Sequence, residues 1–340
     1  MEQSMTALVP LNNPTALPRL HEAGVGEVYV GFHDDEWERR FGDAELNRMS
    51  GFGLEANPFD FGEMCTQIER ARSLGMHAFV CFNATSYSRD QLAFMAEAYF
   101  PRLKSAGAHG VILSSLGGID AARQAGLNVT MSTIAGVYNA HLAAFYRDRG
   151  ATRIILPRDL ASDEVAGIVR TVPDVEYEVF MMRNGCLFSD SHCLGCHRAG
   201  NPSLCMSLRT GEHRIWLAND ARNLRGTEGA NEEFLQRAWE NDQLLNEQYH
   251  RRTCGLCALW RFEQLGIDAY KVVGRGDDVD DLCSDAALVM RNLARARSCA
   301  TEQDYLQSME LPRDPETLCG MRGLSCYYPE LRRGKRASAS

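Results

Sequence analysis

The sequence predicts an α/β fold, a TIM-barrel-like (β/α)8 with a long cysteine-rich insertion between its seventh and eighth strands. Short runs rich in Val, Ile, Tyr and Phe alternate with stretches of helical length, which is typical of βα units around a parallel sheet. Eight such runs favour a closed barrel. In chain order they are Ala7–Pro10, Glu27–Phe32, His77–Asn83, Gly110–Ser115, Val129–Thr133, Arg153–Pro157, Glu176–Met181 and Ala269–Gly274.

The segments between the runs support the same fold. Glu63–Leu74 and Asp90–Ser105 are long enough for helices, and several helices are expected to end at glycine, which favours the C-cap position. An open doubly wound sheet is the competing fold, but it would not need eight units, and no Gly-rich phosphate loop follows the first strand. The glycines just before predicted strands are Gly24, Gly75, Gly107, Gly126 and Gly266.

Two long interruptions follow strands two and seven. Residues 182–268 replace a loop and helix that take roughly 20 to 30 residues in an ordinary barrel. Asp34–Phe61 follows strand two, and both segments open onto the carboxyl ends of the strands, where barrel enzymes bind substrates. The Asp34–Phe61 segment forms either a lid over a ligand or an ordinary exposed loop. Its notable side chains are Trp37, Arg39, Arg40, Arg48 and Asn57.

Composition and charge restrict the function. The chain has 340 residues with 36 Lys and Arg against 45 Asp and Glu, and the net charge of −9 disfavours nucleic acid as a partner. We expect a cytoplasmic protein without a membrane span, because no apolar stretch approaches twenty residues and no signal peptide is apparent. The expected divisions are 1–184 for strands one to seven, 185–258 for the cysteine-rich insertion, 259–298 for barrel completion, and 299–340 for a C-terminal appendage with a basic tail.

The insertion carries thiols at spacings that suit a metal. Thiolates are soft ligands for iron-sulfur clusters and zinc, and in a reducing cytosol many cysteines indicate metal or redox chemistry rather than disulfides. The alternative is that the cysteines are small buried apolar residues. The thiols are Cys186, Cys193, Cys196 and Cys205, followed by Cys254 and Cys257.

Several segments resemble known family motifs in register. They are Glu22–Gly31, Ser132–Thr133, Gly150–Leu160, Glu176–Phe180 and Tyr270–Arg275, with a six-residue gap between Cys186 and Cys193. Together they resemble the peptidase U32 (collagenase-like) family, whose members include the oxygen-independent hydroxylation proteins of ubiquinone synthesis and RNA modification. The resemblance implies a 4Fe-4S cluster held by Cys186, Cys193, Cys205 and Cys254.

The ligand set has alternatives. Cys196 and Cys257 form Cys-x-x-Cys pairs with Cys193 and Cys254, and two such pairs would also make a zinc site. The match of the cysteine spacing to the family pattern favours the iron-sulfur cluster over zinc. Cys65 and Cys81 are expected in the core. Four further cysteines are either a second cluster or packing residues, namely Cys283, Cys299, Cys319 and Cys326.

The resemblance implies an iron-sulfur-dependent, oxygen-independent hydroxylase or related oxidoreductase. It would act on a small substrate, with an aromatic one among the candidates, and would use prephenate as oxygen donor. A carboxylated donor needs cations at the barrel mouth, and Arg158, Lys271 and Arg275 lie at or just beyond strand ends. The alternative for these three residues is structural ion pairing with Asp159, Glu178 or Asp268.

Two family positions differ in this chain. The family histidine is replaced by Met182 and a family glutamate by Val273, so steps that depend on them do not transfer. One alternative is therefore a non-catalytic metal-binding subunit that acts with a homologous partner or as a homodimer. Another is an RNA-modifying enzyme. A protease is disfavoured, because the sequence has no Gly-x-Ser-x-Gly or zincin motif.

Overall fold

In the computed structural model, eight parallel strands close into a barrel in the order β1-β10-β9-β8-β7-β6-β5-β2. The structure describes residues 6–186, 189–192, 252–312 and 325–332. The fold is therefore the TIM-barrel-like α/β fold that the sequence predicts. The barrel strands are β1 (Thr6–Pro10), β2 (Glu27–Val30), β5 (His77–Phe82), β6 (Gly110–Leu113), β7 (Asn128–Met131), β8 (Arg153–Ile155), β9 (Glu176–Met182) and β10 (Ala269–Val272).

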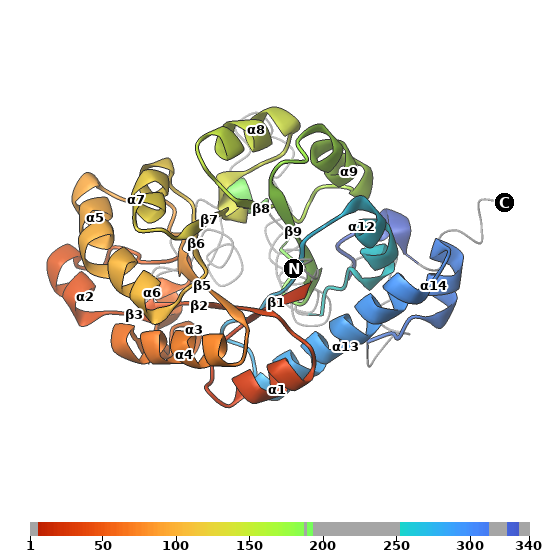
Figure 1. Ribbon diagram of the computed structural model, residues 1–340, viewed down its shortest axis with the longest axis horizontal. Helices are drawn as coiled ribbons and strands as arrows, with labels where there is room; N and C mark the ends of the chain where they lie inside the picture. The colour runs from red at the N-terminus through yellow and green to blue at the C-terminus, as the bar shows by residue number, and fades with distance from the viewer. Residues whose placement is uncertain (1–5, 187–188, 193–251, 313–324, 333–340) are drawn as a thin grey trace, which may run out of the picture.

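Helices surround the barrel, and α13 runs beside α1, next to the first strand (Figure 1). The helix between β5 and β6 is continuous through a π-helical turn, Met95–Tyr99. The helices are α1 (Ala16–Glu22), α2 (Asp35–Phe41), α3 (Gly53–Ala56), α4 (Phe61–Ser73), α5 (Arg89–Phe94), α6 (Phe100–Ala106), α7 (Ile119–Gln124), α8 (Ala140–Asp148), α9 (Ser162–Thr171), α12 (Leu259–Leu265), α13 (Val279–Ser298) and α14 (Glu302–Ser308).

Local sequence explains where these elements begin and end. The five glycines before the strands have φ between 76° and 89°, the left-handed region in which a side chain is strained, so each ends its helix. At the start of α4, the Asp60 carboxylate accepts from the Glu63 N–H at 2.8 Å, and the Glu63 carboxylate accepts from the Asp60 N–H at 3.2 Å. This capping box satisfies two backbone donors that a helix start leaves unpaired.

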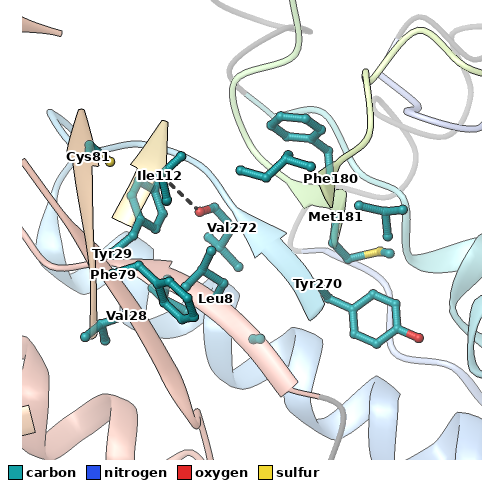
Figure 2. Packing of buried hydrophobic residues seen from close by; sticks show 14 of the residues in the cluster. Leu8, Val28, Tyr29, Phe79, Cys81, Ile112, Phe180, Met181, Tyr270 and Val272 are labelled. Atoms are coloured by element: carbon teal, nitrogen blue, oxygen red, sulfur yellow. Dashed lines mark hydrogen bonds between the residues drawn. The ribbon is translucent and has the colours of Figure 1, made fainter. Parts of the chain in front are cut away.

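Along each strand, successive side chains point alternately into the barrel and toward the surrounding helices. Figure 2 shows Leu8, Tyr29 and Phe79 gathered between the strands, with the Tyr29 hydroxyl donating to the Val272 carbonyl at 3.4 Å. Tyr270 points the other way, where its hydroxyl donates to Glu263 of α12 at 2.8 Å. The interior is a packed core, so a ligand has to bind at its rim.

Ionised side chains close the amino-terminal end of the barrel. Arg153, at the start of β8, is 2% exposed; its Nη2 donates to Glu27 at 2.8 Å and its Nε to Glu176 at 2.8 Å. Burial raises the pKa of Glu27, but the Arg153 guanidinium outweighs it and lowers that pKa to about 2. Because barrel enzymes place their chemistry at the opposite end, this cluster is a structural feature.

The eight predicted strands and the glycine helix ends are confirmed. The segment Asp34–Phe61 is folded: it contains α2, α3 and β4 (Phe59–Asp60), which pairs with β3 (Phe32–His33). Trp37 is 2% exposed, and its indole N–H donates to the Ala44 carbonyl at 2.7 Å. The segment is thus more ordered than a simple exposed loop. Most of the insertion lies outside the described residues, and the four-part division of the chain stays a prediction.

Candidate functional site

A buried carboxylate joins four segments at the carboxyl ends of the strands. Asp190 is 0% exposed and follows β9. It accepts hydrogen bonds from Arg48 Nη1 at 2.8 Å, Arg158 Nε at 2.6 Å and Thr133 Oγ1 at 3.1 Å. Burial raises the pKa of Asp190, but the two guanidiniums outweigh it and hold that pKa well below its usual range. We call this group the Asp190 clasp.

Arg158 is fully engaged within the clasp. Its Nη1 donates to the Asn184 carbonyl at 2.5 Å, and its guanidinium lies 4.1 Å from the centre of the Phe180 ring. The partner of Arg158 is Asp190, whereas Asp159 accepts from the Tyr138 hydroxyl. The structural ion pair considered for Arg158 therefore exists, with a different carboxylate. Arg158 holds the start of the cysteine-bearing segment against the barrel.

Lys271 is also paired. Its Nζ lies 2.7 Å from Glu178 Oε1 and 4.0 Å from the centre of the Tyr29 ring, inside the barrel. Glu178 is 0% exposed, and its second oxygen has no hydrogen-bond partner among the described residues. That oxygen lies 3.9 Å from Arg153 Nη1. Glu178 thus links the charged base of the barrel to its rim.

Arg275 differs from the other two cations. It lies just beyond β10 and is 6% exposed, yet within the described part of the chain no carboxylate comes within 4.0 Å of it. Its recorded hydrogen bond is a long one, from Nη1 to Asn57 Oδ1 at 3.4 Å. A Cβ added to Gly31 would lie 2.0 Å from Arg275 Nη1, so the guanidinium occupies a recess that only glycine leaves open. Among the described residues, Arg275 is therefore a buried cation with no carboxylate in ion-pair distance.

The thiol-bearing segments meet beside this rim. Met182 at the end of β9 forms an antiparallel bridge with Cys254, and the Arg183 N–H donates to the Thr253 carbonyl at 2.7 Å. Arg183 and Asn184 then adopt positive φ of 68° and 43°, which redirects the chain toward Cys186. A Cβ on Gly185 would lie 2.3 Å from Thr253 Oγ1. The backbone therefore brings the segments of Cys186 and Cys254 together.

The other predicted ligands are not placed. Cys193, Cys196 and Cys205 lie outside the described residues, and so does Cys319. Within the described residues no group of three or more His, Cys, Asp or Glu side chains could hold a metal ion. Cys81 is 2% exposed in β5 and Cys283 is 6% exposed in α13, as expected for packing residues.

Sequence reasoning missed Asp190 and the role of Arg48 as its partner. Asp190 lies in a loop whose other residues drew attention for their thiols, and its partners are distant in the chain. Only the position of Arg158 directly after a strand pointed to this place. Asn57 and Arg48, noted as possible lid residues, do reach the rim.

Comparison with known proteins identifies the family. The profile of peptidase family U32 matches residues 12–316. The chain belongs to this family. Within the described residues, no helix is long and apolar enough to cross a membrane.

Curated relatives of this U32 chain carry two kinds of name. A tRNA hydroxylation protein P of Haemophilus influenzae is 28% identical over 140 residues, which cover 41% of this chain and 30% of the relative. An uncharacterized protease of Methanocaldococcus jannaschii is 26% identical over 281 residues, covering 80% of this chain and 61% of the relative. The chain thus spans less than two thirds of the length of each of these relatives.

Solved structures resemble the chain at lower similarity. A U32 peptidase aligns with a TM-score of 0.40 and 14% identity, covering 54% of this chain and 70% of its own. A tryptophan synthase from M. tuberculosis aligns with a TM-score of 0.45 and 12% identity, covering 85% and 93%.

Proposed function

We propose that this U32 protein is an iron-sulfur-dependent, oxygen-independent hydroxylase or related oxidoreductase that binds a carboxylate-bearing small molecule at the barrel mouth. The observation that carries the proposal is Arg275, a guanidinium that is 6% exposed with no carboxylate within 4.0 Å among the described residues. Burying an uncompensated cation costs several kcal/mol, and an anionic ligand would offset that cost.

The three cations at the rim then have different roles. Arg158 and Lys271 are already paired with Asp190 and Glu178, so they hold the rim in shape. Arg275 remains available to form a bidentate contact with a carboxylate. The bound molecule would lie over Gly31 and next to Asn57, whose side-chain amide already donates to the Met49 and Gly53 carbonyls.

The proposed cofactor is a 4Fe-4S cluster held by Cys186, Cys193, Cys205 and Cys254, with Cys196 and Cys257 as alternates and zinc as the alternative metal. The donor chemistry supports this, because four thiolates suit either group, and the pairing of Met182 with Cys254 brings the chain segments that carry Cys186 and Cys254 together. A bound cluster would supply the electron transfer. The protein's own residues bind the donor, orient it and exclude water.

The proposal has one preferred reactant and two alternatives. Prephenate is the proposed oxygen donor, since its carboxylates match Arg275. The names of two relatives support an RNA substrate as a second candidate, whereas the net charge of −9 disfavours one. Met182 and Val273 at the two family positions support the third candidate, a metal-binding subunit that works beside a homologous partner.

Binding of prephenate to the anaerobically purified protein tests the role of Arg275. We expect Arg275→Gln to weaken binding about 10- to 100-fold, because a charge-assisted hydrogen bond contributes about 1.5 to 3 kcal/mol. Arg275→Lys keeps the charge but loses the bidentate geometry, so its affinity should fall between the two. Arg291→Gln on the outer surface of α13 is the matched control. Equal affinities for all four proteins in calorimetry would exclude Arg275 as the anion contact.

A further inference from the structure

Cys326 lies beside Cys254 although they come from distant parts of the chain. The two residues form a parallel β-bridge, in which the Cys254 N–H donates to the Ser325 carbonyl at 2.9 Å. The Tyr327 N–H in turn donates to the Cys254 carbonyl at 3.0 Å. Paired residues in a parallel ladder lie about 4.8 Å apart and project their side chains to the same face. The two thiols are therefore neighbours.

The sulfur of Cys254 accepts a backbone hydrogen bond. The Leu256 N–H points at Cys254 Sγ at 3.4 Å, within the turn of the Cys254-Gly255-Leu256-Cys257 sequence. A neutral thiol is a weak acceptor, whereas hydrogen bonds to sulfur stabilise and tune a metal-bound thiolate. The turn is thus preorganised for a ligating Cys254.

The segment that carries Cys326 is firmly docked. Tyr328 is 4% exposed; its hydroxyl donates to the Phe180 carbonyl at 3.3 Å, and its ring packs edge-on against Phe262 with centroids 4.8 Å apart. The Tyr327 hydroxyl donates to the Arg183 carbonyl at the turn that leads to Cys186. The two tyrosines that follow Cys326 therefore bind the segment to the end of β9 and to the turn after it.

This segment also lies beyond the part of the chain that matches the family, residues 12–316. Cys326 therefore lies outside the matched region, and it pairs with Cys254, one of the positions where the family pattern places a ligand. The sequence alone placed it with Cys283, Cys299 and Cys319, as either a second cluster or a packing residue. The backbone pairing with Cys254 separates it from Cys283, which is buried in α13.

We propose that Cys326 is a thiolate ligand of the same metal site as Cys254, so that the C-terminal segment 325–332 completes that site. The inference rests on the proposed metal binding and extends it, because it adds a ligand that the family pattern does not contain. The metal would be one that thiolates favour, as a cluster iron or as zinc. Removing the segment, or the Cys326 sulfur alone, should then weaken metal binding.

Alkylation of the full-length protein tests this directly. Anaerobically purified protein is treated with iodoacetamide before and after the metal is removed with a chelator, and peptide masses report each cysteine. We expect the loaded protein to protect Cys254 and Cys326 together, at least tenfold relative to the stripped protein. Cys65, half-buried on α4, should react equally in both.

The metal content of a Cys326→Ala variant provides a second test. Cys326→Ala should lose at least half of its bound metal in a chelator concentration that leaves the wild type and Cys65→Ala loaded. If Cys326 reacts equally in loaded and stripped protein while Cys254 is protected, the metal site exists without Cys326 and the inference is wrong. If neither thiol is protected and no metal copurifies, the inference and the proposed cofactor both fail. The wild-type alkylation decides the matter even where Cys326→Ala does not fold.

Discussion

Replacing Asp190 by asparagine should destabilise the protein strongly. The Asp190 carboxylate is 0% exposed, and its partners Arg48 and Arg158 have side chains only 16% and 9% exposed. Asp190→Asn keeps the shape but removes the buried negative charge that the Arg48 and Arg158 guanidiniums share. Removing one partner of a buried ionic group costs about 3 to 5 kcal/mol, so we expect the free energy of unfolding to fall by about that amount.

Urea unfolding followed by circular dichroism measures this change, with bound metal determined in parallel. Asp159→Asn is the matched control, since that carboxylate accepts from Tyr138 near the surface and should cost about 0.5 kcal/mol or less. Adding Arg48→Met to Asp190→Asn should recover part of the loss, because one of the two guanidiniums that lose the Asp190 charge is then gone. Equal stability of wild type and Asp190→Asn would refute the view that the clasp holds the rim together.

The loss of unfolding free energy in Asp190→Asn should depend on pH in one direction. Because the pKa of Asp190 is held well below its usual range, the clasp contributes its full stability above the unfolded-state pKa of about 3.9. That contribution is lost only as the pH falls through the lower folded-state value. The difference between wild type and Asp190→Asn should therefore stay constant from about pH 8 to pH 5 and shrink in stronger acid.

Three further results follow from the barrel. Gly31→Ala should weaken prephenate binding, because its Cβ would lie 2.0 Å from Arg275 Nη1; unchanged affinity in calorimetry would argue against the recess. Lys271→Met should reduce the free energy of unfolding more than Lys271→Met combined with Glu178→Gln, since the single change removes the nearer cation from the buried Glu178 carboxylate and leaves it with Arg153 at 3.9 Å; additive losses would contradict this. Burial, followed by the charge of His77, lowers the pKa of His109 to about 4. Stability should thus fall as the pH drops from about 6.5 toward that value, and His109→Gln should remove this part of the dependence.

The barrel was predictable because its signals are local. Alternation of apolar runs and helical stretches identified all eight strands, and a glycine with positive φ follows the helix at each of the five expected places. These features depend on neighbouring residues and on burial on both faces of a parallel sheet. The folded structure of Asp34–Phe61 was harder to predict from the sequence, since it depends on tertiary contacts of Trp37 with Tyr87 and Phe94.

The candidate site was only partly predictable because its pairings are distant in the chain. Position after a strand indicated Arg158, Lys271 and Arg275. Only the structure shows that Arg158 and Lys271 pair with carboxylates, whereas Arg275 has none within 4.0 Å among the described residues. Glu178 was among the carboxylates considered as ion-pair partners, and it does pair with Lys271. Asp190 was not considered as an ion-pair partner, because nothing in the neighbouring sequence indicates that two distant arginines bind its carboxylate.

We propose that the cysteines of this U32 chain hold an iron-sulfur cluster at the barrel mouth. Iron, acid-labile sulfide and zinc should be measured per chain after purification without oxygen, for the wild type and for Cys186→Ala. The account predicts about four irons and four sulfides in the wild type, as in a 4Fe-4S cluster on four thiolates, and their loss in the variant. About one zinc per chain with no sulfide would contradict it.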